Sequence, residues 1–210
     1  VSTAFTLSVD TVAPTTTTTI LYADNVGASQ GDFGTGTTTD DRSPLLKGTL
    51  SAALATGETV GIYEGTTLLG TATVSATNWT FVLPDALADG SAHTYVAKVM
   101  DVAGNVGGTA SLTVNVDLTV VVEAQTTVDT TPIVTGYIGF ELLAGEYVEV
   151  TVNGVTYSSQ TGDVVVDPLN NTWYVQIPSG NALAVGTYDV VATLRAADGS
   201  TVTADNTSGE

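Results

Sequence analysis

Apolar and polar residues alternate in short runs along most of the chain, which is the pattern of half-buried β-strands. Turn residues, mainly Gly, Asp and Asn, separate these runs. In the first half the runs cover 45–50, 58–63, 68–74, 79–83, 94–100 and 110–116. With a first strand expected over 15–22, this makes about seven strands, the number in an immunoglobulin-like sandwich. No convincing 3.6-residue periodicity is present, so the sequence predicts an all-β protein.

Three short motifs of the first half recur in the same order in the second half, which indicates an internal repeat. Residues 41–44 followed by Gly48 correspond to residues 129–132 followed by Gly136. Residues 57–60 correspond to 145–148. Trp79 with Pro84 corresponds to Trp173 with Pro178. The runs 3–10 and 111–117 both end in Val-Asp, 107 positions apart (117 − 10). We therefore expect two tandem immunoglobulin-like β-sandwich domains, 11–117 and 118–210. Residues 1–10 would be the last strand of a preceding repeat or a linker.

Composition limits the possible functions. The chain has 210 residues, of which 43% are hydrophobic, so it is expected to fold despite its charge. It has 4 Lys plus Arg against 22 Asp plus Glu, a formal net charge of −18. Nucleic acid and anionic membranes need a basic surface, so both are excluded as partners. There is no cysteine, hence no disulfide or thiolate metal site. No apolar run reaches the roughly 18 residues of a membrane helix, and the first residue is not Met, which suggests a monomeric fragment of a longer protein.

A hairpin turn over 101–105 offers oxygen ligands of the kind that Ca²⁺ prefers, from Asp101 and Asn105. In an immunoglobulin-like sandwich the chain enters at the end that carries the last hairpin, so Asp10 and Glu58 should lie nearby. We predict one Ca²⁺ site from these four residues. The alternative is that Asp101 only caps its own turn. The matching turn of the second half, 196–200, has Ala196 in place of the leading Asp and Ser200 in place of the Asn, which weakens the case for a metal site there.

The long loop 23–43 is a second candidate for Ca²⁺, because it is rich in Gly, Thr and Asp and loops of this length are uncommon unless something orders them. It is expected at the end where the chain leaves the first domain. The acidic residues there are Asp24, Asp32, Asp40, Asp41 and Asp117. Carboxylates packed together repel one another unless a cation separates them. The alternative is a solvated acidic loop.

Candidates for catalysis are poor. His93 is the only histidine, and we expect it on a strand surface, so no His-dependent triad is predicted. The many acidic residues single out no pair for glycoside hydrolysis. The Thr run 15–19 could suggest ice binding or glycosylation, but strand propensity explains it more simply. Three tyrosines expected to be exposed leave a carbohydrate-binding module open: Tyr137, Tyr157 and Tyr174.

Several motifs together resemble the bacterial Ig-like repeats of very large biofilm adhesins, the secreted RTX-type or BapA-like proteins. In the first half they are 9–14, the loop from 24–27 to 39–41, 78–81 and 101–105. The second half is similar to another repeat type of the same adhesins at 127–132, 152–155 and 186–192. The resemblance implies an extracellular spacer without enzyme activity, stiffened by Ca²⁺ at domain junctions. Its partners would be neighbouring repeats of the same chain. The alternative is a module of such an adhesin that binds carbohydrate or ice.

Overall fold

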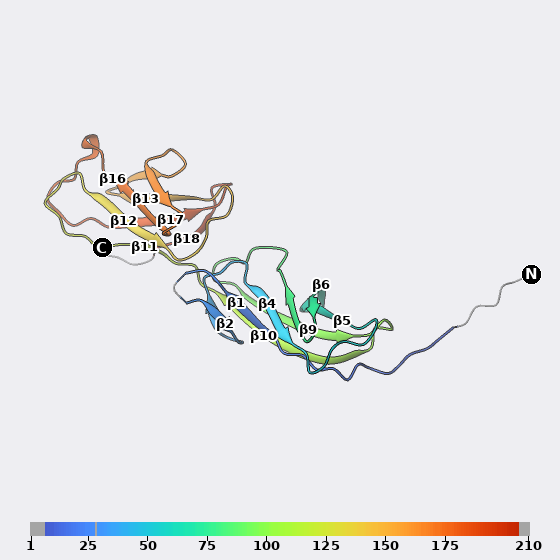
Figure 1. Ribbon diagram of the computed structural model, residues 1–210. Coiled ribbons are helices and arrows are strands. Elements are labelled where there is room, and N and C mark those ends of the chain that lie inside the picture. The colour runs from blue at the N-terminus through green and yellow to red at the C-terminus, as the bar shows by residue number, and fades with distance from the viewer. Residues whose placement is uncertain (1–6, 28, 206–210) are drawn as a thin grey trace, which may run out of the picture.

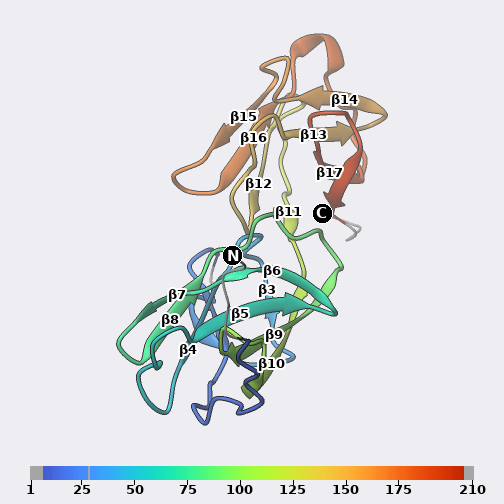
Figure 2. The same cartoon turned by 90° about the vertical axis from the view of Figure 1, so that its right-hand side faces the viewer.

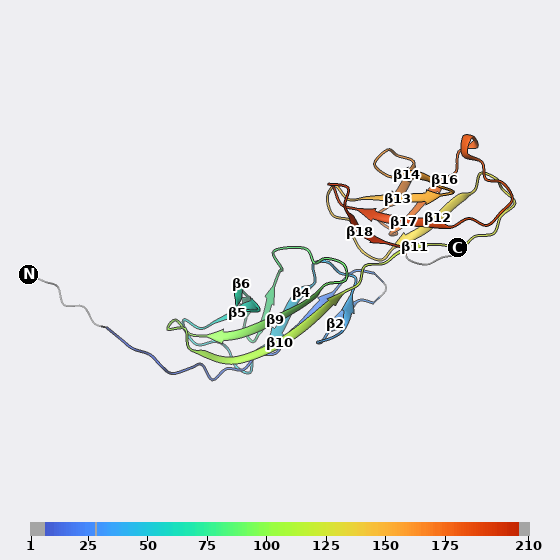
Figure 3. The ribbon, with the colours of Figure 1, turned by 180° about the vertical axis from the view of Figure 1, so that it is seen from behind.

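The computed structural model describes residues 7–27 and 29–205, and within them the chain forms two β-sandwiches in succession (Figure 1). We call the sandwich made by β1 to β10 domain 1 and that made by β11 to β18 domain 2. Domain 2 lies beyond the end of domain 1 at which β10 ends and β11 begins, as the view from behind also shows (Figure 3).

Domain 1 consists of two five-stranded sheets, in the orders β2-β1-β4-β8-β7 and β3-β10-β9-β5-β6. The first contains β1 (Leu21–Asp24), β2 (Gly31–Phe33), β4 (Leu45–Thr49), β7 (Thr73–Ser75) and β8 (Asn78–Phe81). The second contains β3 (Thr38–Thr39), β5 (Thr59–Glu64), β6 (Thr67–Thr71), β9 (Ala92–Met100) and β10 (Val106–Val116). All neighbouring strands are antiparallel except β3, which runs parallel to β10.

Domain 2 repeats this arrangement with two four-stranded sheets, β11-β12-β16-β15 and β14-β13-β17-β18 (Figure 2). Their order corresponds to β1-β4-β8-β7 and β6-β5-β9-β10 of domain 1, so β2 and β3 are additions of domain 1. The first sheet contains β11 (Val120–Val122), β12 (Ile133–Ile138), β15 (Val164–Asp167) and β16 (Thr172–Gln176). The second contains β13 (Tyr147–Val152), β14 (Val155–Ser158), β17 (Val190–Arg195) and β18 (Thr201–Ala204). The all-β tandem immunoglobulin-like fold is therefore confirmed.

Each core is built around one tryptophan that faces a glycine on the neighbouring strand. Trp79 pairs with Gly48 and Trp173 with Gly136 in the register of the strands, and both rings are 1% exposed. A Cβ on Gly48 would lie 2.6 Å from the Trp79 ring, and one on Gly136 would also overlap its tryptophan. The Nε1 of Trp79 donates to Thr18 Oγ1 at 2.9 Å. The repeat that the sequence predicts is thus also a repeat of side-chain packing.

Several strand boundaries differ from the prediction. The run 68–74 is two strands, because β6 pairs with β5 in one sheet and β7 with β8 in the other. The first strand begins at Leu21, and only an isolated bridge, Thr18 to Leu50, precedes it. Of the strand expected over 3–10, residues 7–10 are not in a strand, and the remainder lies outside the described residues. A helix long and apolar enough to cross a membrane is not found in the described part of the chain.

The loop 23–43 is more ordered than the sequence indicates. It contains β2, which extends the first sheet by pairing with β1, and β3, which pairs with the end of β10. Two of its polar residues are buried and bonded to each other, since Thr39 Oγ1 donates to Asp24 Oδ2 at 2.6 Å. Hydrogen bonds to its neighbours therefore order a segment that is too polar to be recognised as core.

Candidate functional site

A buried ion pair joins the two domains. Arg42 lies between β3 and β4, and its Nη1 is 2.6 Å from Glu146 Oε1 in the loop before β13. The two side chains are only 11% and 5% exposed. The second carboxylate oxygen of Glu146 accepts the N–H of Leu143 at 2.9 Å. Sequence reasoning missed this contact, although Arg42 is one of only 4 basic residues and Glu146 matches Glu58 in the repeat.

We define the junction cluster as Asp24, Asp40 and Asp41. It lies at the same end of domain 1 as Arg42. Asp24 and Asp41 are each 4% exposed. Asp24 Oδ1 accepts the N–H of Val26 at 2.9 Å, while Asp41 Oδ1 accepts the N–H of Ser43 at 2.7 Å. Asp41 Oδ2 is buried and has no hydrogen-bond partner. Burial raises the pKa of Asp41, and the charges of Asp24 and Glu141 act in the same direction, while the backbone N–H groups of Ser43 and Asn25 lower it.

Asp40 is only partly buried, and its carboxylate lies near Gly139 of domain 2. A Cβ on Gly27 would overlap its carboxylate and would lie 2.7 Å from the carbonyl oxygen of Gly139. Gly27 has φ +63°, a conformation that favours glycine. Burial, followed by the charge of Asp24, raises the pKa of Asp40 to about 6. Burial therefore disfavours the charged forms of Asp40 and Asp41, which lie beside the carboxyl group of Asp24.

The structure separates the remaining acids of the long loop from this cluster. Asp32 forms an exposed ion pair with Lys47 at 2.8 Å. Asp117 is exposed, and its backbone N–H donates to Thr39 O at 3.0 Å, beside the cluster. Within residues 7–27 and 29–205, no three acidic or histidine side chains already surround a common point as metal ligands. The junction cluster has the donor type for Ca²⁺, and an ion would have to draw its carboxylates together.

At the opposite end of domain 1, the turn 101–105 touches both segments that the sequence places beside it. Asn105 Nδ2 donates to the backbone oxygen of Asp10 at 3.2 Å. A Cβ on Gly57, next to Glu58, would lie 2.9 Å from Val102 Cγ1. The four predicted ligands thus belong to one region of the surface, while Ca²⁺ binding there stays a prediction.

The oxygens of that turn are, however, already engaged within it. Asp101 Oδ1 accepts the N–H groups of Ala103 and Asn105, both at 2.9 Å, and Oδ2 accepts Asn105 Nδ2 at 2.9 Å. These bonds, the one from the Asn105 side chain above all, lower the pKa of Asp101. The carboxylate therefore has a structural role as an Asx-turn former.

The corresponding turn of domain 2 keeps the backbone shape with different side chains. Ala196 N donates to Ser200 O at 2.9 Å, as Asp101 N does to Asn105 O at 3.2 Å. Asp198 Oδ1 accepts both the N–H and the hydroxyl of Ser200, at 2.9 and 2.6 Å. The acidic residue has thus moved from the first position of the turn to the third.

His93 lies in a hydrogen-bonded chain with two other polar residues. Its Nδ1 is 2.7 Å from Glu64 Oε1, and its Nε2 is 3.0 Å from Ser91 Oγ. Ser91 donates its own hydroxyl to Ala88 O at 2.5 Å, so the proton points away from the histidine. The N–H groups of Gly90 and Ser91 bond to Val116 O and Ala88 O and cannot serve as an oxyanion hole. The arrangement does not meet the requirements of a serine hydrolase.

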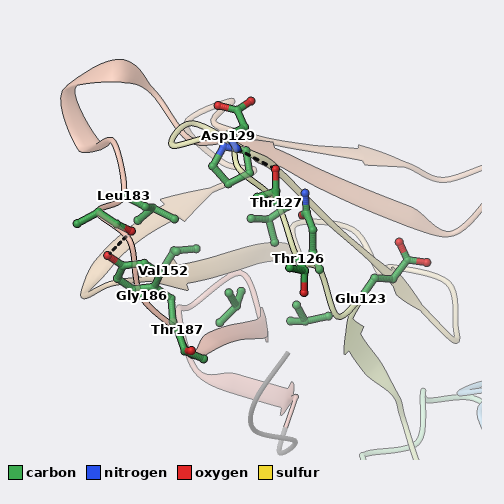
Figure 4. Close-up of a pocket in the computed structure, with 15 residues that line it drawn as sticks. Glu123, Thr126, Thr127, Asp129, Val152, Leu183, Gly186 and Thr187 are labelled. Atoms are coloured by element: carbon green, nitrogen blue, oxygen red, sulfur yellow. Dashed lines mark hydrogen bonds between the residues drawn. The ribbon is translucent and has the colours of Figure 1, made fainter.

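A cavity of about 300 Å³ in domain 2 lies between the segments 122–134 and 183–190, with Val152 at its wall (Figure 4). Tyr188 donates its hydroxyl to Ala184 O at 3.1 Å, and Glu123 Oε2 accepts Thr135 Oγ1 at 2.6 Å. Asp129 N donates to Thr127 Oγ1 at 3.0 Å (Figure 4). Many of the polar groups around this cavity therefore form hydrogen bonds within the local loops.

Comparison with known proteins gives one family match and distant structural matches. No curated protein matches the chain. Among solved structures, the titin domains z1z2 in complex with telethonin are 13% identical, with a TM-score of 0.34, and the match covers 86% of this chain and 90% of that one. The fibronectin(III)-like modules of CbhA from Clostridium thermocellum are also 13% identical, with a TM-score of 0.28 and coverages of 89% and 90%. Residues 5–118 match the family described as bacterial Ig-like domain. The chain belongs to the bacterial Ig-like domain family.

Proposed function

We propose that the chain is a spacer segment of a secreted bacterial adhesin, in which Ca²⁺ at the domain junction fixes one Ig-like domain relative to the next. It would hold a binding region away from the cell surface and so support adhesion and biofilm formation. Two tandem sandwiches support this proposal. The resemblance to adhesin repeats in both halves supplies the extracellular context.

The observation that carries the Ca²⁺ part is the buried, unpartnered Oδ2 of Asp41. An orphaned carboxylate oxygen that is almost fully buried is costly unless a cation or water occupies the space beside it. Asp24 and Asp40 add two more carboxylates, and burial together with the charge of Asp24 raises the pKa of Asp40 to about 6. Ca²⁺ takes six to eight oxygen ligands, which carboxylates, backbone carbonyls and water together can supply.

At this position an ion would act on the relative motion of the domains. Asp40 lies against Gly139 of domain 2, and Arg42, two residues later, is bonded to Glu146. Drawing Asp24, Asp40 and Asp41 together would therefore tighten the segment that carries the interdomain ion pair. The chain's own residues supply the contact, and the cation would remove the repulsion that opposes it.

The test compares the chain in Ca²⁺ and in EDTA by thermal unfolding and small-angle X-ray scattering. We expect EDTA to lower the melting temperature and to increase flexibility between the domains. Unchanged values of both would refute the Ca²⁺ part of the proposal and leave a metal-independent spacer.

A second candidate function, carbohydrate binding, has one specific observation in its favour. Tyr137 and Tyr174 lie diagonally across β12 and β16 on the outer face of the sheet and are each 44% exposed. Thr49 and Thr80 occupy the matching positions of domain 1. Tyr157 does not contribute, because it is buried, at 6% exposed, and its hydroxyl accepts Asn181 Nδ2; the expectation that it is exposed was wrong.

A glycan array with the wild-type chain and with Y137A/Y174A tests this candidate, and T49A/T80A is the matched control. Binding that is lost only in the tyrosine variant would support it. The absence of any glycan binding would remove it. The Thr run 15–19 gives no comparable support for ice binding, since Thr16 is buried and Thr18 and Thr19 bond to Trp79 and Thr49.

A further inference from the structure

The two domains carry the same surface at the end where the chain enters, which we call the entry face. It consists of 55–58 and 101–105 in domain 1 and of 143–146 and 196–200 in domain 2. Glu58 Oε2 accepts the N–H of Ala55 at 2.9 Å, and Glu146 Oε2 accepts that of Leu143 at the same distance. A Cβ on Gly57 would lie 2.9 Å from Val102, and one on Gly145 would lie 2.9 Å from Ala197.

The entry face of domain 2 has an occupant in this structure. The remaining oxygen of Glu146, Oε1, takes the guanidinium of Arg42, which comes from the opposite, or exit, end of domain 1. On the entry face of domain 1, no side chain of residues 7–27 or 29–205 pairs with the corresponding Glu58 Oε1. The neighbouring Val102 is 86% exposed. One copy of the face is thus docked, and the other presents the same carboxylate without a cation.

The exit end of domain 2 cannot supply that cation. Leu87 N donates to Arg42 O at 2.8 Å, and the matching bond of domain 2 runs from Leu183 N to Thr130 O at 2.7 Å. Thr130 therefore occupies the position of Arg42, in agreement with the repeat of 41–44 in 129–132. A second copy of this chain placed end to end would meet Glu58 with a threonine. The face fits a domain whose exit end resembles that of domain 1.

We propose that the entry face of domain 1 docks the exit end of a preceding Ig-like domain, with an arginine at the position of Arg42 donating to Glu58. The inference rests on the proposed function only in requiring a tandem array. It assigns Glu58 a guanidinium partner, and it makes the Arg–Glu contact a recurring connection that needs no Ca²⁺.

The test places a second copy of domain 1, residues 11–117, directly before residue 11 of the chain. This fusion keeps the Asp-Thr sequence of positions 10 and 11 at the new junction and puts Arg42 of the first copy before Glu58 of the second. Because the chain has no cysteine, cysteines introduced at the exposed Thr80 of both copies can carry spin labels. Electron paramagnetic resonance in EDTA then reports the width of the distance distribution between the two copies.

We expect Arg42→Gln in the first copy and Glu58→Gln in the second to broaden the distribution equally, with no further broadening when both are present. The charge reversal, Arg42→Glu with Glu58→Arg, should restore the narrow distribution. Glu58→Gln in the first copy, which has no domain before it, is the matched control and should have no effect. A width that does not change with Glu58→Gln in the second copy would overturn the inference. Since EDTA is present throughout, this result is independent of the Ca²⁺ part of the proposed function.

Discussion

Neutralising either member of the Arg42–Glu146 pair should uncouple the two domains. Exposed ion pairs contribute about 0.2–1 kcal/mol, whereas hydrogen bonds to charged groups that are shielded from water contribute about 1.5–3 kcal/mol. With an N–O distance of 2.6 Å and exposures of 11% and 5%, this pair belongs to the second class. The cost of about 3–5 kcal/mol for stranding a buried charge is an upper limit, because the domains can separate and rehydrate the remaining group.

A double-mutant cycle of Arg42→Gln and Glu146→Gln measures the coupling directly. Urea unfolding can be followed by fluorescence, since Trp79 and Trp173 give each domain one buried reporter. We expect a coupling free energy of about 1.5–3 kcal/mol. Glu58→Gln is the control, because Glu58 makes the same bond to its own loop but has no arginine partner in the described part of the chain. A coupling below about 0.5 kcal/mol, the range of exposed pairs, would refute the assignment of the pair as an interdomain connection.

Three further predictions concern the cluster, the turn and the cores. Folding raises the pKa of Asp40 to about 6, so its charge destabilises the folded chain above that pH, and this penalty disappears as the pH falls below about 4. In EDTA, Asp40→Asn should therefore raise the melting temperature at about pH 8 but not at about pH 4. An equal effect of the substitution at both pH values would contradict the raised pKa. Folding lowers the pKa of Asp101, so Asp101→Ala should lower the melting temperature at neutral pH, by an amount that shrinks below about pH 4. A decrease in melting temperature that does not depend on pH would argue against the hydrogen bonds that the Asp101 carboxylate accepts within the turn. Gly48→Ala and Gly136→Ala should each cost about 1–3 kcal/mol or more in urea unfolding, because the methyl group meets a backbone carbonyl oxygen and a tryptophan ring. Gly180→Ala, with nothing within 4 Å, should be nearly neutral.

The sequence was sufficient for the strands that alternate regularly and for the internal repeat. The pairs Gly48 with Trp79 and Gly136 with Trp173 explain why, since each glycine leaves the space that its tryptophan fills. The sequence pattern was insufficient to predict β2 and β3, because Asp24 and Thr39 are polar residues that are buried and hydrogen-bonded to each other. Hydrophobic patterning cannot identify polar residues of that kind as part of the fold.

Sequence spacing indicated a region for each candidate site but not its hydrogen bonds. Asn105 contacts Asp10, and Gly57 lies near Val102, yet spacing could not reveal that both oxygens of Asp101 are used within the turn. The interdomain ion pair joins residues 104 positions apart, and one-dimensional patterns carry no information about such a contact. Which acids of the long loop meet also depends on tertiary structure, since Asp32 pairs with Lys47 instead.

The most direct test of the central claim is a calorimetric titration of Ca²⁺ into the chain and into Asp41→Asn, with Asp32→Asn as the matched control. We expect binding to the wild-type chain and to Asp32→Asn, and its loss in Asp41→Asn, because Asp41 brings a buried oxygen without a partner among the described residues to the domain junction. Ca²⁺ binding that is equally strong in all three proteins, or absent from the wild-type chain, would contradict it.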